Sequence, residues 1–169
     1  MKTLVIHPTD NSTDFLSEVY KEKDYTVITK NYSCSFLKKQ IKNHDRILFL
    51  GHGTESGLIG FNKFIINSSL VYLLRDKYCF YIWCNADKFV KKYNLKGFYT
   101  GMIISEYDEA ESYNINPITH SVTDSNFWLA KALSVIIDVD NKVDMIKDLY
   151  QSERNEIIKY NRNNFYENN

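Results

Sequence analysis

Short apolar runs alternate with amphipathic segments along most of this chain, and this rhythm restricts the folds open to it. Five runs have the length and composition of buried strands: Thr3–Pro8, Tyr25–Lys30, Arg46–Gly51, Tyr78–Cys84 and Phe98–Ser105. Alternation of strands and helices predicts a parallel sheet that is covered by helices on both faces and has right-handed crossovers. We therefore expect an α/β fold, a three-layer sandwich with a mostly parallel sheet of five or six strands in the order 2-1-3-4-5.

The remaining segments predict the helices and the extent of the domain. Apolar residues recur at helical spacing in 12–24, 35–44, 68–77, 86–97, 126–138 and 143–157. Gly97 is expected to end the fourth of these helices. The polar stretch 106–125 predicts an irregular loop, in which 118–123 offers a short sixth strand. We expect one domain over 1–160 and a frayed, Asn-rich tail over 161–169.

Composition limits the classes of partner and compartment. The 169 residues include 44% hydrophobic side chains and carry equal numbers of acidic and basic groups, 21 of each. A neutral globular chain gives no reason to expect a nucleic acid polymer or a membrane as partner. The start of the chain becomes polar too soon for a signal peptide, and three cysteines without paired spacing favour a reducing compartment, so we expect a cytoplasmic protein. The standard phosphate-binding loops are absent, and no cofactor is expected.

Several reactive side chains follow directly after the predicted strands. His7 ends the first strand, His52 the third and Cys84 the fourth, while Ser105 and Glu106 end the fifth. The carboxyl ends of parallel strands meet at one edge of a sheet, where α/β proteins place their sites. The sequence therefore predicts that these residues converge.

A cysteine beside a histidine on neighbouring strand ends is the layout of an activated nucleophile. An imidazole within hydrogen-bond reach generates or stabilises the reactive thiolate. Gly51 and Gly53 flank His52, and the sequence suggests that Gly51 allows the turn. Gly53 could offer its N–H, together with that of Cys84, as an oxyanion hole.

Less specific interpretations of the same residues stay open at this point. A free cysteine is often a small buried hydrophobe, and the two glycines around His52 could serve only a tight turn. A metal site formed by His7, His52, Cys84 and Asp87 lacks the usual ligand spacing, so no metal is expected.

The two signatures together resemble the caspase-like cysteine peptidases, which include metacaspases, gingipains, separases and CHAT domains. In that superfamily a histidine follows strand three and a cysteine follows strand four of a six-stranded α/β core, and His52 and Cys84 match these positions. The segment Gly101–Tyr113 looks like the strand-five end that borders the primary specificity pocket in relatives. The resemblance spans Lys2–Ile137.

The resemblance implies a cysteine hydrolase of the peptidase type, with a Cys84–His52 dyad and a peptide or protein substrate. Glu106 or Asp108 would then line a pocket for a Lys or Arg side chain. The alternative is a non-catalytic module that sequesters a small nucleotide-like ligand or metabolite at the rim formed by five residues, namely His7, Thr9, Asp10, His52 and Glu106. A pseudo-enzyme that keeps the fold for protein contacts is a third option, and homo-oligomerisation is left open.

Overall fold

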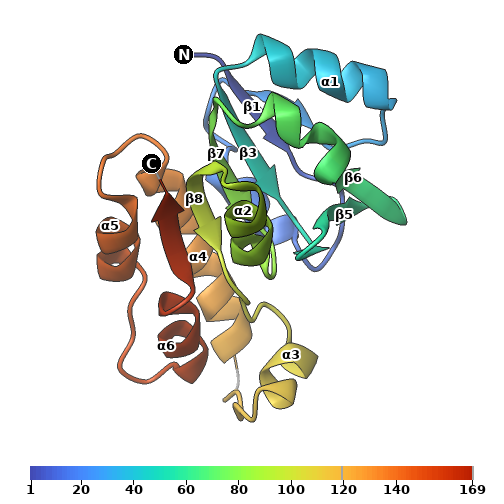
Figure 1. Ribbon diagram of the computed structural model, residues 1–169. Coiled ribbons are helices and arrows are strands. Elements are labelled where there is room, and N and C mark those ends of the chain that lie inside the picture. The colour runs from blue at the N-terminus through green and yellow to red at the C-terminus, as the bar shows by residue number, and fades with distance from the viewer. Residues whose placement is uncertain (119, 169) are drawn as a thin grey trace.

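The computed structural model, which describes residues 1–118 and 120–168, is built around a six-stranded sheet (Figure 1). Across the sheet the order is β2 (Thr26–Ile28), β1 (Thr3–Ile6), β3 (Arg46–Leu50), β7 (Tyr78–Ile82), β8 (Lys96–Thr100) and β9 (Phe165–Asn168). The first five strands are parallel and β9 is antiparallel to β8. The expected order 2-1-3-4-5 is confirmed for the parallel strands.

Helices cover both faces of this sheet and complete the three-layer sandwich, as expected (Figure 1). One face is covered by α1 (Cys34–Asn43), η2 (Ser68–Leu73) and α2 (Ala86–Tyr93). The other is covered by η1 (Asp14–Val19), α4 (Ser121–Ile136), α5 (Lys142–Leu149) and α6 (Glu156–Arg162). The central strands β3 and β7 are buried on both faces, which explains their unbroken apolar sequences.

Local signals set several element boundaries. Ser33 caps α1 by accepting a hydrogen bond from the N–H of Phe36. Helix α2 ends at Tyr93, followed by Asn94 as a C-cap in the left-handed conformation, and not at Gly97 as predicted. Gly97 lies inside β8 with φ +139°, and a Cβ atom there would stand 1.8 Å from the carbonyl oxygen of Cys79. This glycine is therefore required by close strand packing and not by a helix end.

The sixth strand corrects the predicted boundaries of the domain. The segment 161–168, expected to be a frayed tail, contains the end of α6 and all of β9. Phe165 pairs with Thr100 and is 2% exposed, and the side chain of Asn168 donates a hydrogen bond to the carbonyl of Leu95. Residue 119 of the alternative sixth strand, 118–123, lies outside the described residues, and 121–123 belong to α4.

A second, small sheet follows His52, in a stretch for which the sequence predicted no strand. Its antiparallel strands are β4 (Gly53–Thr54), β5 (Gly57–Gly60) and β6 (Lys63–Ile66). The polar stretch after β8 also differs from the prediction, since it contains α3 (Tyr107–Ser112) and the first turn of α4. The fifth parallel strand ends at Thr100, earlier than expected, and the chain closes with three helices instead of two.

Candidate functional site

The carboxyl ends of β3 and β7 share one small cavity. It has a volume of about 30 Å³ and is lined by residues from both strand ends, from the start of η1 and from the segment after β8. Its wall includes Gly51, His52, Cys84, Thr13 and Ser105. A space of this size holds one or a few water molecules. The structure thus brings His52 and Cys84 to a common cavity.

Gly51 sets the direction in which His52 leaves β3. Its φ of +139° strongly favours glycine, and its N–H donates a 3.1 Å hydrogen bond to the carbonyl of Ile82 on β7. The strand therefore turns sharply after Leu50 and the next residue leaves the sheet. The expectation that Gly51 allows the turn agrees with this geometry.

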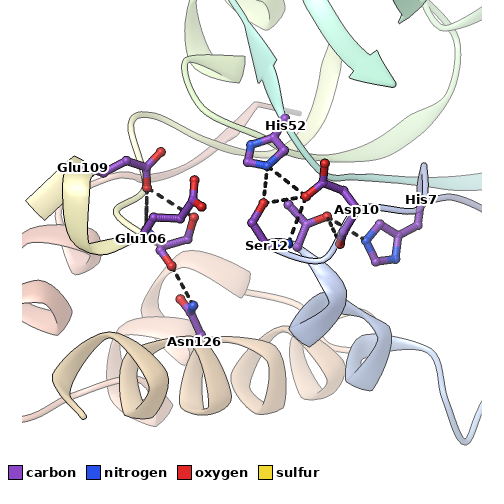
Figure 2. Close-up of polar contacts among 9 residues, drawn as sticks. His7, Asp10, Ser12, His52, Glu106, Glu109 and Asn126 are labelled. Atoms are coloured by element: carbon purple, nitrogen blue, oxygen red, sulfur yellow. Dashed lines mark hydrogen bonds and ion pairs between the residues drawn. The ribbon is translucent and has the colours of Figure 1, made fainter. Parts of the chain in front are cut away.

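The imidazole of His52 contacts two polar residues of the loop that follows β1 (Figure 2). Its Nε2 atom lies 2.5 Å from Ser12 Oγ and 3.6 Å from Asp10 Oδ1. The same Asp10 oxygen accepts hydrogen bonds from the hydroxyl and the backbone N–H of Ser12, at 2.6 and 2.9 Å. The Ser12 hydroxyl is the main reason that the pKa of Asp10 is lowered, so this group is a carboxylate at neutral pH.

Cys84 lies between the end of β7 and the start of α2. Its Sγ donates a 3.4 Å hydrogen bond to the carbonyl oxygen of Ile103. Burial raises the pKa of the thiol to about 11, and the nearby carboxylates of Glu109 and Glu106 add to the rise. Cys84 is therefore a protonated thiol at rest. Within the described part of the chain, no hydrogen bond joins it to His52.

Gly53 has a packing role that the sequence did not suggest. It lies in β4 and does not line the cavity. A Cβ atom at this position would stand 2.2 Å from Cδ1 of Trp83, whose indole N–H donates to the carbonyl of Thr54. The structure does not bring Gly53 and Cys84 together at the cavity, and the close approach of the Trp83 ring accounts for the glycine.

Two predicted rim residues hold the β1 end together instead of lining the cavity. His7 is 3% exposed, with Nδ1 2.9 Å from the Tyr20 hydroxyl and Nε2 3.4 Å from Thr13 Oγ1. Burial lowers the pKa of this imidazole. Thr9 donates its hydroxyl to the carbonyl of Thr29 on the neighbouring chain segment, at 2.7 Å.

The predicted acidic pocket residues belong to the start of α3. Glu106 and Glu109 form a reciprocal capping box, in which Glu109 also accepts a 2.8 Å hydrogen bond from the N–H of Ser105 (Figure 2). Asp108 is exposed in the first turn of the same helix. Neither Glu106 nor Asp108 lines the cavity, whereas Ser105 does. Asn126 ties this segment to α4 through a 2.8 Å bond to the Ser105 carbonyl.

Ser12 is the site residue that sequence reasoning missed. The sequence alone does not show its role, because that role depends on a contact with a residue 40 positions away. The available signal was the polar run from Thr9 to Thr13 directly after the first strand.

The structure also bears on the metal and membrane alternatives. Among residues 1–118 and 120–168, no three His, Cys, Asp or Glu side chains come together as metal ligands, so the set containing His7, His52, Cys84 and Asp87 does not assemble. In the same residues no helix has the length and apolar character needed to span a bilayer.

Comparisons with known proteins add little to this picture. No family model matches the chain, and no curated protein matches it. Among solved structures, the crystal structure of Smu.1420 from Streptococcus mutans UA159 aligns at 13% sequence identity with a TM-score of 0.33. The alignment covers 96% of this chain and 100% of that one. A similarity this low carries no argument about the fold or the function.

Proposed function

We propose that this protein is a caspase-like cysteine hydrolase that cleaves peptide bonds, with Cys84 as nucleophile and His52 as general base. One observation carries the proposal: the two side chains come from the carboxyl ends of the neighbouring parallel strands β3 and β7 and line one cavity. The six-stranded sheet agrees with the resemblance to the caspase-like superfamily drawn from the sequence.

The protonation state of the thiol determines how this dyad would work. With a pKa of about 11, Cys84 rests as a thiol, so proton removal must accompany attack. His52 accepts the Sγ proton as sulfur bonds to the substrate carbonyl carbon. The imidazolium then returns that proton to the leaving amine as the C–N bond breaks. The acyl-thioester is hydrolysed by a water that His52 deprotonates in turn, and the thiol is regenerated.

Two further expectations about the site change with the structure. Of the two oxyanion donors expected from the sequence, the proposal keeps only the backbone N–H of Cys84, since Gly53 packs against Trp83. The acidic groups of α3 lie close enough to raise the pKa of Cys84, so a cationic substrate side chain beside Glu106 or Glu109 would counter their charge.

Turnover of a peptide library tests the proposal. We expect cleavage products from wild-type protein, and a loss of at least about a hundredfold in Cys84→Ala and in His52→Ala. Cys34→Ser is the matched control, because this cysteine is exposed and lies outside the site. Unchanged cleavage in Cys84→Ala would exclude the proposed nucleophile.

The hydrogen bond from Cys84 to Ile103 favours a second candidate function, in which the protein only binds a ligand. A thiol that already donates a hydrogen bond to a carbonyl need not act as a nucleophile. The ligand would bind at the rim near Asp10, Ser12 and Ser105. The candidate is a module that sequesters a small nucleotide-like ligand or metabolite. A rise in melting temperature with one compound of a nucleotide and metabolite panel, without its turnover, would favour binding over hydrolysis.

A further inference from the structure

We infer that Ser12 and Asp10 are positioning residues that fix the tautomer and orientation of His52. Asp10 holds the Ser12 hydroxyl, Ser12 accepts the Nε2–H of His52, and Nδ1 is left as the ring atom that can take a proton. The identity of the group that gives this proton, Cys84, rests on the proposed function. The direction of the two hydrogen bonds, from His52 to Ser12 and from Ser12 to Asp10, does not.

The direction of each hydrogen bond follows from which of the three groups carries a hydrogen. A serine hydroxyl carries one hydrogen and accepts others, whereas an ionised carboxylate only accepts. Because Asp10 is ionised at neutral pH, the 2.6 Å contact uses the hydroxyl hydrogen of Ser12. The 2.5 Å contact between Ser12 Oγ and Nε2 must then use a hydrogen on the imidazole. A neutral His52 with Nε2 protonated has its lone pair on Nδ1.

The loop that carries Ser12 is itself held in place. The carbonyl of Asp10 accepts hydrogen bonds from the N–H and the hydroxyl of Thr13, at 3.2 and 3.3 Å. Thr13 is buried and contacts the ring of His7 beneath it. Ser12 therefore sits in a closed turn anchored on β1, which fixes its hydroxyl relative to the end of β3.

The charge of Asp10 gives the arrangement a second effect. Its carboxylate lies 3.6 Å from Nε2, so it stabilises the imidazolium that forms when Nδ1 accepts a proton. In enzymes with an activated nucleophile, the histidine base commonly faces the nucleophile with one ring nitrogen, while a third group holds the other ring nitrogen. When the imidazole has the wrong tautomer, most of the catalytic rate is lost. Here a serine stands between the carboxylate and the imidazole (Figure 2).

Nitrogen NMR of the histidine imidazoles tests the inference without an assay of catalytic activity. The chain has four histidines, so single His→Gln variants assign the signals. At pH 9, where an imidazole is neutral, we expect His52 of the wild type to be protonated on Nε2. In Ser12→Ala and Asp10→Asn we expect a mixture of both tautomers, and in Ser12→Thr the wild-type state. A wild-type His52 protonated on Nδ1, or no change in Ser12→Ala, would overturn the inference.

Alkylation of Cys84 by iodoacetamide, read by peptide mass spectrometry, separates this inference from the proposed function. We expect Ser12→Ala to slow alkylation of Cys84 at least about tenfold at pH 7.5 and Ser12→Thr to restore it, while Cys34 reacts equally in all variants. A tautomer that depends on Ser12, with Cys84 indifferent to His52→Gln, supports the positioning and overturns the hydrolase. Alkylation that needs His52 but not Ser12 supports the dyad and overturns the positioning role.

Discussion

The ring of Trp83 lies so close to Gly53 that a Cβ atom on the glycine would stand 2.2 Å from Cδ1 of the indole. This contact connects the β4–β5 hairpin, which begins directly after His52, to Trp83, which directly precedes Cys84. Gly53 and Trp83 are therefore the chain neighbours of the two candidate-site residues, so their packing bears on the geometry of the site.

Gly53→Ala should destabilise the protein by about 1–3 kcal/mol, because the added methyl group displaces the Trp83 ring or the hairpin. Urea unfolding followed by tryptophan fluorescence measures the change. Ser56→Ala, in the same hairpin with an exposed side chain, should change the unfolding free energy by less than about 0.5 kcal/mol. Equal stabilities of the two variants would contradict the packing role of Gly53.

Phe165→Ala should cost about 3–5 kcal/mol in unfolding free energy, since this side chain is buried against Phe98 and Tyr150. Chemical denaturation provides the measurement, and the exposed Asn163→Ala serves as control. A small effect of Phe165→Ala would mean that the last strand is dispensable and the domain ends earlier.

Arg46→Met should lower the unfolding free energy by about 2–3 kcal/mol. The buried guanidinium donates to four groups, which are the Thr3 hydroxyl, the Ile137 carbonyl, the Asp138 carboxylate and the Tyr25 hydroxyl. Lys23→Met removes only the partly exposed ion pair to the same Asp138 and should cost less than about 1 kcal/mol. Thermal or urea unfolding compares the two variants, and a similar cost for both would show that the buried network adds nothing.

The free energy of unfolding should decrease as the pH is lowered below about 6.5, because of His7. Burial lowers the pKa of this imidazole below its ordinary value of 6.5, so the unfolded chain binds a proton more readily than the folded one. The stabilisation by neutral His7 is complete above pH 6.5 and is lost as the pH falls toward the folded pKa, with a slope of at most about 1.4 kcal/mol per pH unit.

Urea unfolding between pH 5.5 and 8 measures this effect, and His7→Gln should flatten the curve. Carboxylates stay ionised in this range, so the difference between the two curves isolates His7. Parallel curves for the wild type and His7→Gln would contradict the assignment.

The order of the parallel strands could be predicted because each strand has its own local apolar pattern. The same order places residue 52 and residue 84 on neighbouring strand ends, and the structure brings His52 and Cys84 to one cavity. These predictions need only the sequence of elements and the geometry of parallel sheets.

Features that depend on distant contacts could not be predicted in the same way. Strand β9 has one fully buried apolar residue, Phe165, and its pairing with β8 is not visible in its own Asn-rich sequence. The strands β4, β5 and β6 of the small sheet are short, and both β4 and β5 contain glycine. The contact between Ser12 and His52 depends on a loop turn, and the raised thiol pKa of Cys84 depends on burial that a strand end does not reveal.

The pH dependence of Cys84 alkylation by iodoacetamide tests the dyad most directly. Wild-type protein and His52→Gln are compared from pH 6 to pH 10, with Cys34 as internal reference in each sample. We predict that the wild type has a reactive component near neutral pH that His52→Gln lacks, leaving only a rate that rises toward the thiol pKa of about 11. Superimposable profiles for the two proteins would contradict the claim that His52 acts as the base for Cys84.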